Sequence, residues 1–398
     1  MQRPTNKPKV AIACGGTGGH LFPGIAVAEE LMIRGASVTL LVSPKEVDQQ
    51  AVKGVRGAQV ATLPAVGFTS GGNLAFFKGL LGSLSATRKL FRDARPAAVL
   101  AMGGFTSAAP VWVGRRLGAR TYLHDSNTIP GRANRWLAHL VDDAFVYFHE
   151  TSGRLNNPGV HVVGMPVRPQ FQPMAAASAR MALGLAANRP TLLVMGGSQG
   201  ASGINKLMTG ALADFMAAFP GWQFIHLTGA GDADVVRAAY VAAKARAVVQ
   251  PFLSEMEFAL GAATLAVSRS GASSLAELAA LRVPAVLIPY PTAADDHQRH
   301  NARAFVETGA AWSFEQNGAS SVAFTRLLMR LAGDAPARAS VQAALAQWDF
   351  PDAARDIAAH IGKAIGLSEP VDQFSDRPRP EGDGFISRPL RPQEVGIS

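Results

Sequence analysis

The chain has 398 residues, of which 48% are hydrophobic and 17% charged, and its formal net charge is +9. This length and composition suit two domains with sizeable cores and exclude general disorder. The positive charge favours anionic partners such as phosphates or an acidic lipid surface. We expect no nucleic acid partner, because aromatic residues make up only 7% of the chain and no basic stretch is interleaved with them.

The chain contains a single cysteine, Cys14. This count excludes an intrachain disulfide and a cysteine-cluster zinc site, and the apolar run before Cys14 indicates a small core residue rather than a nucleophile. No signal core follows the polar segment Met1–Lys9, because glycines soon interrupt the apolar run. No apolar segment approaches the ~20 residues that a membrane span requires. The sequence therefore predicts a protein that is cytoplasmic or peripheral on a membrane.

Short apolar runs alternate with helix-like stretches along most of the chain. The first series of predicted strands comprises Val10–Ala13, Val38–Val42, Ala98–Met102, Thr121–His124, Ala144–Phe148 and Val160–Val163. The second series comprises Thr191–Met195, Phe224–Leu227, Val248–Phe252, Leu265–Val267 and Ala285–Ile288. Continuous apolar runs of this kind are typical of parallel sheets buried on both faces. The sequence thus predicts an α/β protein with two Rossmann-like doubly wound parallel-sheet domains facing each other across a cleft.

The segment Gly164–Pro169 has two prolines close to a glycine and predicts a connection between domains. We therefore expect a first domain over residues 1–164 and a second over 165–349. A C-terminal helix at about 350–366 is expected to pack back on the first domain. From about residue 367 the composition turns to proline, glycine and charge, which predicts a disordered tail over 367–398.

Each predicted domain begins with a glycine-rich turn after its first strand. The turn Gly15–His20 leads into a helix that Gly35 is expected to end, and its spacing differs from the G-x-G-x-x-G fingerprint, which disfavours a nicotinamide enzyme. The turn Gly196–Ala201 contains Ser198, which could donate to a diphosphate together with the nearby amides. The alternative for either turn is a tight strand-to-helix connection with nothing bound. The position of both turns at the carboxyl edge of a sheet favours a ligand.

Two later segments of the second domain also follow predicted strands. Glu277 lies about two helical turns after the strand that ends at Val267, so its carboxylate could accept from both hydroxyls of a ribose; the alternative is a surface glutamate. The polar segment 289–301 is rich in side chains that hydrogen-bond sugars. Its histidines, His297 and His300, have the helical spacing of metal ligands, but no third ligand is suggested nearby, so we expect no metal there.

The segment His124–Gly131 stands at another strand end in the first domain. Asp125 and Asn127 could serve only to form a turn. Their place at the carboxyl edge of the predicted sheet favours a role in binding instead.

Taken together, these segments resemble the MurG-type N-acetylglucosaminyltransferases of peptidoglycan synthesis, which belong to glycosyltransferase family 28. The resemblance runs from about Val10 to Gly366 and rests on four motifs: GGTGGH, H-x-x-N-x-x-P-G, GGSQGA and the S-R-S-G-A turn with its later glutamate. The resemblance implies a GT-B fold for the two predicted domains. It also implies transfer of N-acetylglucosamine from UDP-N-acetylglucosamine to lipid I, with inversion at the sugar carbon, which gives lipid II. It also implies a place in cell wall synthesis, cell shape and cell division, at the cytoplasmic face of the inner membrane.

The resemblance implies roles for individual residues. The family's donor-binding positions correspond to Thr17, Gly18, Asn127, Arg168, Ser198, Leu253, Glu277 and Gln298. Among them, Asn127 and Gln298 would contact the donor sugar, Arg168 and Ser198 the diphosphate, the Leu253 backbone the uracil, and Glu277 the ribose. Thr17 and Gly18 belong to the first-domain loop near the acceptor. We expect His20 to be the catalytic base, since the pKa of an imidazole can lie near working pH.

Two positions depart from the family pattern. Asp125-Ser126 stands where the family commonly has Glu-Gln, and His297 stands where some members have glutamine. The first departure puts a direct catalytic part for the Asp125 carboxylate in doubt, and the second bears on the choice of donor sugar. No Asp-x-Asp metal motif stands out, so we expect neither an obligatory metal nor a cofactor.

A predicted helix near residues 74–95 combines an apolar face with cations. The apolar residues are Leu74, Phe76, Phe77, Leu80, Leu81 and Leu84, and the cations are Lys78, Arg88, Lys89, Arg92 and Arg95. Such a face suits an anionic membrane surface, where a polyprenyl-linked acceptor would be found. The alternative is a core helix with a solvated basic end. Contacts with other cell-wall synthesis proteins are also possible.

Three other functions fit parts of the pattern. They are a glycolipid synthase of the same fold that acts on diacylglycerol, a UDP-N-acetylglucosamine 2-epimerase, and a UDP-sugar sensor without activity. The predicted lipid-facing helix and the first glycine turn argue against the epimerase. The presence of His20, Arg168 and Glu277 together argues against the sensor.

Overall fold

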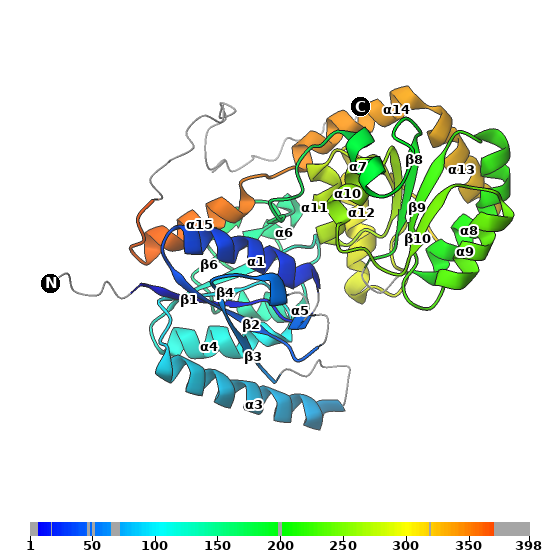
Figure 1. The fold of residues 1–398 in the computed structure, drawn as a ribbon. Coiled ribbons are helices and arrows are strands. Elements are labelled where there is room, and N and C mark those ends of the chain that lie inside the picture. The colour runs from blue at the N-terminus through cyan, green and yellow to red at the C-terminus, as the bar shows by residue number, and fades with distance from the viewer. Residues whose placement is uncertain are drawn as a thin grey trace, which may run out of the picture.

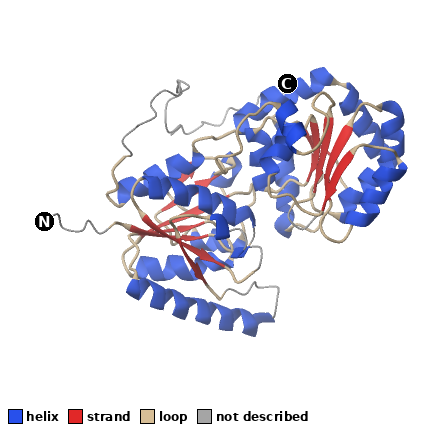
Figure 2. Cartoon of the chain, in the orientation of Figure 1, coloured by secondary structure: helices blue, strands red, loops and turns tan. Residues whose placement is uncertain are grey.

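The structure of the protein is a computed structural model. It describes residues 7–16, 18–45, 48–49, 52–64, 72–197, 201–317 and 320–369, without the side chains of residues 72–77 and 105. Two parallel sheets dominate the chain, and helices cover both faces of each (Figures 1 and 2). The predicted GT-B fold class is confirmed.

The first sheet has seven parallel strands in the order β3-β2-β1-β4-β5-β6-β7. The strands are β1 (Lys9–Ala13), β2 (Ser37–Val42), β3 (Gln59–Thr62), β4 (Ala98–Ala101), β5 (Arg120–Asp125), β6 (Asp143–Val146) and β7 (Val160–Val162). The helices around it are α1 (Gly18–Ile33), α3 (Gly72–Asp93), α4 (Ala108–Arg116), α5 (Arg132–Leu137), α6 (His149–Ser152) and α15 (Ala353–Ala364). Two single turns of 3-10 helix, η1 (Val52–Gly54) and η2 (Phe105–Ser107), complete this region.

The second sheet has six parallel strands in the order β10-β9-β8-β11-β12-β13. The strands are β8 (Thr191–Met195), β9 (Gln223–Leu227), β10 (Ala247–Gln250), β11 (Leu265–Ser268), β12 (Ala285–Leu287) and β13 (Trp312–Ser313). The helices are α7 (Ala176–Ala182), α8 (Ser202–Ala218), α9 (Ala233–Ala242), α10 (Met256–Ala262), α11 (Ala272–Ala280), α12 (His297–Glu307), α13 (Ser321–Gly333) and α14 (Ala335–Ala344), with η3 (Ala294–Asp296) and η4 (Leu345–Trp348). Counted within its own domain, this sheet repeats the strand order 3-2-1-4-5-6, as does the first.

All the predicted strands are present, and two strands at sheet edges escaped prediction. In β3 no residue is buried, and β13 has only two residues, so neither forms a continuous apolar run. The central strands are apolar because both of their faces are covered. β7 and β10 also lie at sheet edges and have no buried residue, but their valines still predicted strands. β3 and β13 were missed because each contributes too few apolar residues to form a run.

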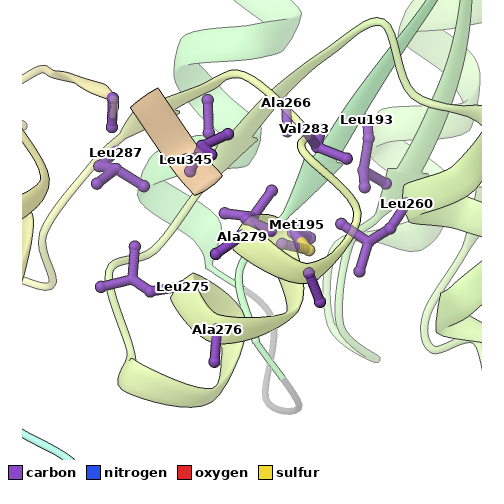
Figure 3. Close-up of a cluster of buried hydrophobic side chains, with 14 of the residues drawn as sticks. Leu193, Met195, Leu260, Ala266, Leu275, Ala276, Ala279, Val283, Leu287 and Leu345 are labelled. Atoms are coloured by element: carbon purple, nitrogen blue, oxygen red, sulfur yellow. The ribbon is translucent and has the colours of Figure 1, made fainter. Parts of the chain in front are cut away.

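One of the two buried clusters of the second domain lies between its sheet and α11. Figure 3 shows Leu275, Ala276 and Ala279 of this helix facing side chains of the sheet, with Leu345 of η4 closing one side. Small residues on one face of α11 allow the helix to approach the strands closely. This packing fixes the start of α11 at the carboxyl edge of the sheet, where the cavity described below opens.

The C-terminal helix α15 returns to the first domain and packs against α1 (Figure 1). Ile357, Ala358 and Ile361 belong to the same buried cluster as residues of α1 and of the first sheet. Gly164, at the start of the connection between the sheets, has φ +85°, and a Cβ atom there would collide with the Phe350 ring. Leu367 packs on the same cluster, and residues 370–398 of the expected tail lie outside the described residues.

Within the described part of the chain, no helix combines the length and the apolar character needed to cross a bilayer.

Candidate active site

A cavity of about 1380 Å³ lies between the two domains. Its walls come from the segments that follow β1, β4 and β5 of the first sheet and β8, β10, β11 and β12 of the second. In doubly wound sheets, ligands bind at this carboxyl edge. The predicted site residues that line the cavity are Gly18, His20, Asn127, Arg168, Leu253, Glu277 and Gln298. Thr17 and Ser198 lie outside the described residues.

A buried carboxylate holds the first glycine turn in place. Asp48 Oδ2 accepts hydrogen bonds from the Gly16 backbone N–H at 2.7 Å and from the Ser43 hydroxyl at 2.6 Å. Gly15 lies so close to β2 that a Cβ atom there would be 2.3 Å from Ser43 N. The glycines of this turn therefore allow tight packing on the sheet as well as access to the cavity.

His20 lies in the first turn of α1, with its ring against a second pair of glycines, Gly103 and Gly104, which follow β4. A Cβ atom at Gly103 would lie 3.0 Å from His20 Nε2 and 3.2 Å from Asn134 Nδ2, and φ at Gly103 is +112°. Only glycine fits at this position, because the imidazole needs the space and the backbone is left-handed. The pair Gly103-Gly104 thus forms the floor under the candidate base.

Burial lowers the pKa of His20 to about 4, and the Asp48 carboxylate opposes this shift only in part. The expectation that this pKa lies near working pH is therefore wrong for the structure described. Desolvation disfavours the charged imidazolium in an enclosed site. At neutral pH the ring is uncharged and has a nitrogen lone pair that can accept a proton.

Asp125 ends β5 and is almost completely buried. Its Oδ1 accepts from the Asn127 backbone N–H at 2.9 Å, and its Oδ2 accepts from the Asn134 side-chain amide at 2.7 Å. Burial raises the pKa of the Asp125 carboxyl to about 6 against these hydrogen bonds. The carboxylate therefore orients the segment that carries Asn127 and, through Asn134, the surroundings of His20.

A fully buried asparagine of α12, Asn301, links the two walls of the cavity. Its Nδ2 donates to Asn127 Oδ1 at 3.0 Å and to the Ser270 backbone carbonyl at 3.1 Å. Its Oδ1 accepts from both the backbone N–H and the hydroxyl of Thr128 at 3.0 Å. One side chain thus joins a first-domain segment to the turn before α11.

A more exposed contact between the domains lies at the rim of the cavity. Asp295 Oδ2 accepts from Arg135 Nη2 at 2.9 Å, and Arg132 lies 3.7 Å from the same carboxylate. Asp295 and its neighbour Asp296 have positive φ values of 49° and 53°. The loop between β12 and α12 is therefore held against α5 in an uncommon backbone conformation.

Arg168 and Glu277 meet at the second-domain side of the cavity, with Arg168 Nη2 3.9 Å from Glu277 Oε1. The guanidinium also lies over the Phe22 and Phe171 rings, at 4.3 and 4.8 Å from their centroids. Burial raises the pKa of the Glu277 carboxyl to about 7, although Arg168 lowers it and Glu257 adds to the rise. A cation held between two rings beside this carboxyl suits an anionic ligand that carries hydroxyl groups.

Two hydrogen bonds hold Gln298 in place. Its side-chain Oε1 accepts from the Tyr290 backbone N–H at 3.0 Å, and its backbone carbonyl accepts from the Ser270 hydroxyl at 2.7 Å. Its amide nitrogen is the part of the side chain with donors to offer a ligand. Leu253 follows β10 and is buried in the wall of the cavity.

One arm of the cavity is apolar and extends between α3, α4 and α5. The side chains that line it include Leu80, Leu84, Trp112, Ile129 and Trp136. Arg88 and Arg116 stack on Trp112, at 5.2 and 4.7 Å from the ring centroid. This arm can take an apolar or amphipathic group with anionic character near its mouth.

The sequence analysis did not identify Gly103, Asn134 or Asn301 as parts of the site. Gly103 and Gly104 directly follow a predicted strand, as the glycines of the two predicted turns do. The same pattern could therefore have indicated a role for Gly103. For Asn301 the local sequence carries no signal of the contact, because its partner Asn127 is 174 residues away. Asn134 is only 9 residues from its partner Asp125, but nothing in its segment distinguishes it from a surface asparagine. Among the described residues, the histidines of segment 289–301 belong to no group with metal-ligand spacing.

The chain resembles known proteins over both domains. The N-terminal domain of glycosyltransferase family 28 matches residues 10–146, and the C-terminal domain of that family matches residues 191–357. Among solved structures, MurG from Acinetobacter baumannii has a TM-score of 0.71 at 24% identity, covering 90% of this chain and 99% of its own. A UDP-N-acetylglucosamine 2-epimerase has a TM-score of 0.67 at 14% identity, covering 91% and 98%. At these identities the two structures show a shared fold.

Curated relatives give a closer match. A protein of Syntrophus aciditrophicus is 37% identical over 310 residues, which are 76% of this chain and 84% of the relative. One of Chlorobaculum parvum is 35% identical over 376 residues, 91% of this chain and 100% of the relative. Both are named UDP-N-acetylglucosamine–N-acetylmuramyl-(pentapeptide) pyrophosphoryl-undecaprenol N-acetylglucosamine transferase. The predicted resemblance is therefore confirmed, and this chain belongs to that family of N-acetylglucosamine transferases within glycosyltransferase family 28.

Proposed function

We propose that this chain transfers N-acetylglucosamine from UDP-N-acetylglucosamine to lipid I, with inversion at the anomeric carbon, to give lipid II. The observation that carries the proposal is that one cavity between the domains brings together His20, Asn127, Arg168, Glu277 and Gln298. The names of the curated relatives agree with this reaction. The first domain would serve the acceptor and the second the donor, with the division near residues 164 and 165.

The second domain supplies the proposed donor site. Arg168 would meet the diphosphate, together with Ser198 and the amides of the second glycine turn. Glu277 would accept from the ribose hydroxyls, and the backbone near Leu253 would hold the uracil. Asn127 and Gln298 would contact the sugar hydroxyls from opposite walls, with Asn301 holding Asn127 in place.

The first domain supplies the proposed base. His20 would take the proton of the muramic acid hydroxyl as the oxygen of that group bonds to the anomeric carbon. The bond from the anomeric carbon to the UDP oxygen breaks in the same step, and the electron pair leaves with UDP. Arg168 and the glycine-turn amides would stabilise the charge that develops on the diphosphate, so the scheme requires no metal.

The low pKa of His20 fits this scheme under one condition. The imidazole is neutral before the reaction, as a base must be, but a group with a pKa of about 4 is a weak base. The anionic diphosphate of the acceptor, once bound beside the ring, would raise this pKa by favouring the charged form. The proposal therefore couples acceptor binding to activation of His20.

The apolar arm and α3 suggest how the acceptor reaches the site. Leu80 and Leu84 line the arm, Leu81 is 67% exposed, and Lys78, Arg88, Lys89, Arg92 and Arg95 are exposed along or just after the helix. Leu74, Phe76 and Phe77 of the expected apolar face lie outside the described side chains. We propose that this side of the first domain contacts an anionic bilayer at the cytoplasmic face of the inner membrane. Other cell-wall synthesis proteins would be partners there.

One assay separates this function from its rivals. Labelled UDP-N-acetylglucosamine is incubated with the full chain and a lipid I analogue, with diacylglycerol, or with no acceptor. We expect a labelled disaccharide product only with the lipid I analogue. A glycolipid would identify the glycolipid synthase, an epimerised nucleotide sugar without acceptor would identify the 2-epimerase, and binding without turnover in any arm would identify a sensor.

A further inference from the structure

Three side chains with metal-binding chemistry meet on the first domain, away from the cavity. Asp143 begins β6, His161 is the middle residue of β7, and His360 lies on the returning helix α15. Their ligand atoms all lie within 4.8 Å of one another, and no other group of this kind occurs among the described residues. Segments separated by 217 residues of sequence are thus brought to one point.

The two imidazole nitrogens lie close to different oxygens of the same carboxylate. His360 Nε2 lies 3.0 Å from Asp143 Oδ2, and His161 Nε2 lies 3.5 Å from Asp143 Oδ1. Ligands placed about 2.0–2.1 Å from a tetrahedral zinc ion lie about 3.3 Å apart. Each of the three side chains is 25–27% exposed, although His161 Nε2 itself is buried, so the site lies just beneath the surface.

The surroundings hold these groups in position. The His360 ring meets Phe145 and Tyr122 edge-on, with centroid separations of 5.3 and 5.9 Å, and the His161 ring lies 5.9 Å from Phe145. A Cβ atom at Gly159 would lie 2.2 Å from Asp143 Oδ1, so the glycine leaves room for the carboxylate. Rings and carboxylate that are already ordered lose little entropy when they bind an ion.

We propose that Asp143, His161 and His360 bind a zinc ion, with water as the fourth ligand. Two imidazole nitrogens and one carboxylate oxygen form a donor set that zinc favours. The two strands give the ion a rigid base, and His360 connects it to α15. The ion fastens the C-terminal helix to the sheet of the first domain and stabilises the fold without taking part in the transfer reaction.

Zinc binding to the metal-stripped, full-length protein tests the proposal. Isothermal titration with zinc chloride is expected to show one equivalent bound, and zinc should raise the melting temperature by about 2–4 °C. The variants His161→Gln, His360→Gln and Asp143→Asn should each lose most of this binding and of the thermal shift. His139→Gln, a change of an exposed histidine in the same domain, should behave as the wild type.

Cobalt substitution tests the geometry without any variant. Cobalt(II) in a four-coordinate site with two imidazoles should absorb strongly in the visible, and zinc should displace that signal. The weak absorption of six-coordinate cobalt would overturn the proposal. Absence of a one-equivalent site in the wild type would also overturn it, as would unchanged binding in all three variants. In that case the carboxylate would serve only as a hydrogen-bond partner of the two histidines.

Discussion

The two walls of the cavity share one strand order but offer different chemistry. The first-domain wall presents a neutral imidazole, whose pKa burial lowers to about 4, beside an apolar arm. The second-domain wall presents a guanidinium beside a carboxyl whose pKa burial raises to about 7. Burial moves both groups toward their uncharged forms, but only the carboxyl has a cation next to it. The carboxyl edges of two similar sheets thus carry a candidate base on one side of the cavity and a candidate anion site on the other.

The largest expected effect is on the first wall. His20→Ala should lower kcat by about 10²–10⁴-fold, because a general base contributes on this scale, and should leave the Kd for UDP-N-acetylglucosamine almost unchanged. Turnover with the lipid I analogue and titration with the donor measure the two quantities. His139→Ala is the matched control, since this histidine is exposed and far from the cavity lining. Full turnover in His20→Ala would remove the histidine from the mechanism.

The next largest effect is expected at the junction between the two walls, which Asn301 joins. Asn301→Ala leaves several buried groups without their partner, at about 1–3 kcal/mol each, and should lower kcat/KM by about 10–100-fold. Arg135→Gln breaks the exposed contact to Asp295 and should lower kcat/KM by less than about fivefold. Steady-state kinetics of both variants test the contrast. Equal effects would show that the buried bridge is no more important than the rim.

A smaller effect is expected on the second wall. Glu277→Ala should weaken UDP binding by about tenfold, because the ribose loses its acceptor, while the rate at saturating donor changes little. Titration with UDP gives the affinity, and Glu255→Ala is the control, as an exposed glutamate of the same domain. An unaltered affinity for UDP would place the ribose elsewhere.

The outer surfaces of the two domains should differ in their response to lipid. Charge reversal on α3, with Lys89→Glu and Arg92→Glu together, should weaken binding to vesicles containing anionic lipid by about tenfold. The same reversal on α13 of the second domain, with Arg326→Glu and Arg330→Glu, should leave binding to these vesicles unchanged. Vesicle flotation measures both. Equal loss from the two helices, or binding that ignores lipid charge, would argue against a membrane contact specific to α3.

A last effect is expected on stability, and its sign follows from the pKa of Glu277. Burial raises the pKa of Glu277 from 4.5 to about 7, so the native state holds this proton more tightly than the unfolded state does. The resulting stabilisation is complete below pH 4.5 and is lost as the pH rises toward 7. Glu277→Gln stays neutral at every pH, so its melting temperature relative to the wild type should be higher at pH 8 than at pH 5. Thermal unfolding at the two pH values checks the sign.

Several features of the molecule could be predicted from sequence because they are recorded locally. Runs such as Leu192–Val194 are apolar because central strands are covered on both faces, and the glycine turns stand where strands end. The four motifs, from the turn Gly15–His20 to the S-R-S-G-A turn before Glu277, together indicated the family. Strands β3 and β13 were not predictable in this way, because each contributes too few apolar residues to form a run.

The sequence by itself determined the two-domain architecture, the family and seven of the residues that line the cavity. Only the tertiary structure decided how those residues act on one another. The bridge made by Asn301, the glycine floor beneath His20 and the cluster of Asp143, His161 and His360 all join segments far apart in the chain. The pKa values of His20 and Glu277 likewise depend on desolvation, which exists only after the domains have packed.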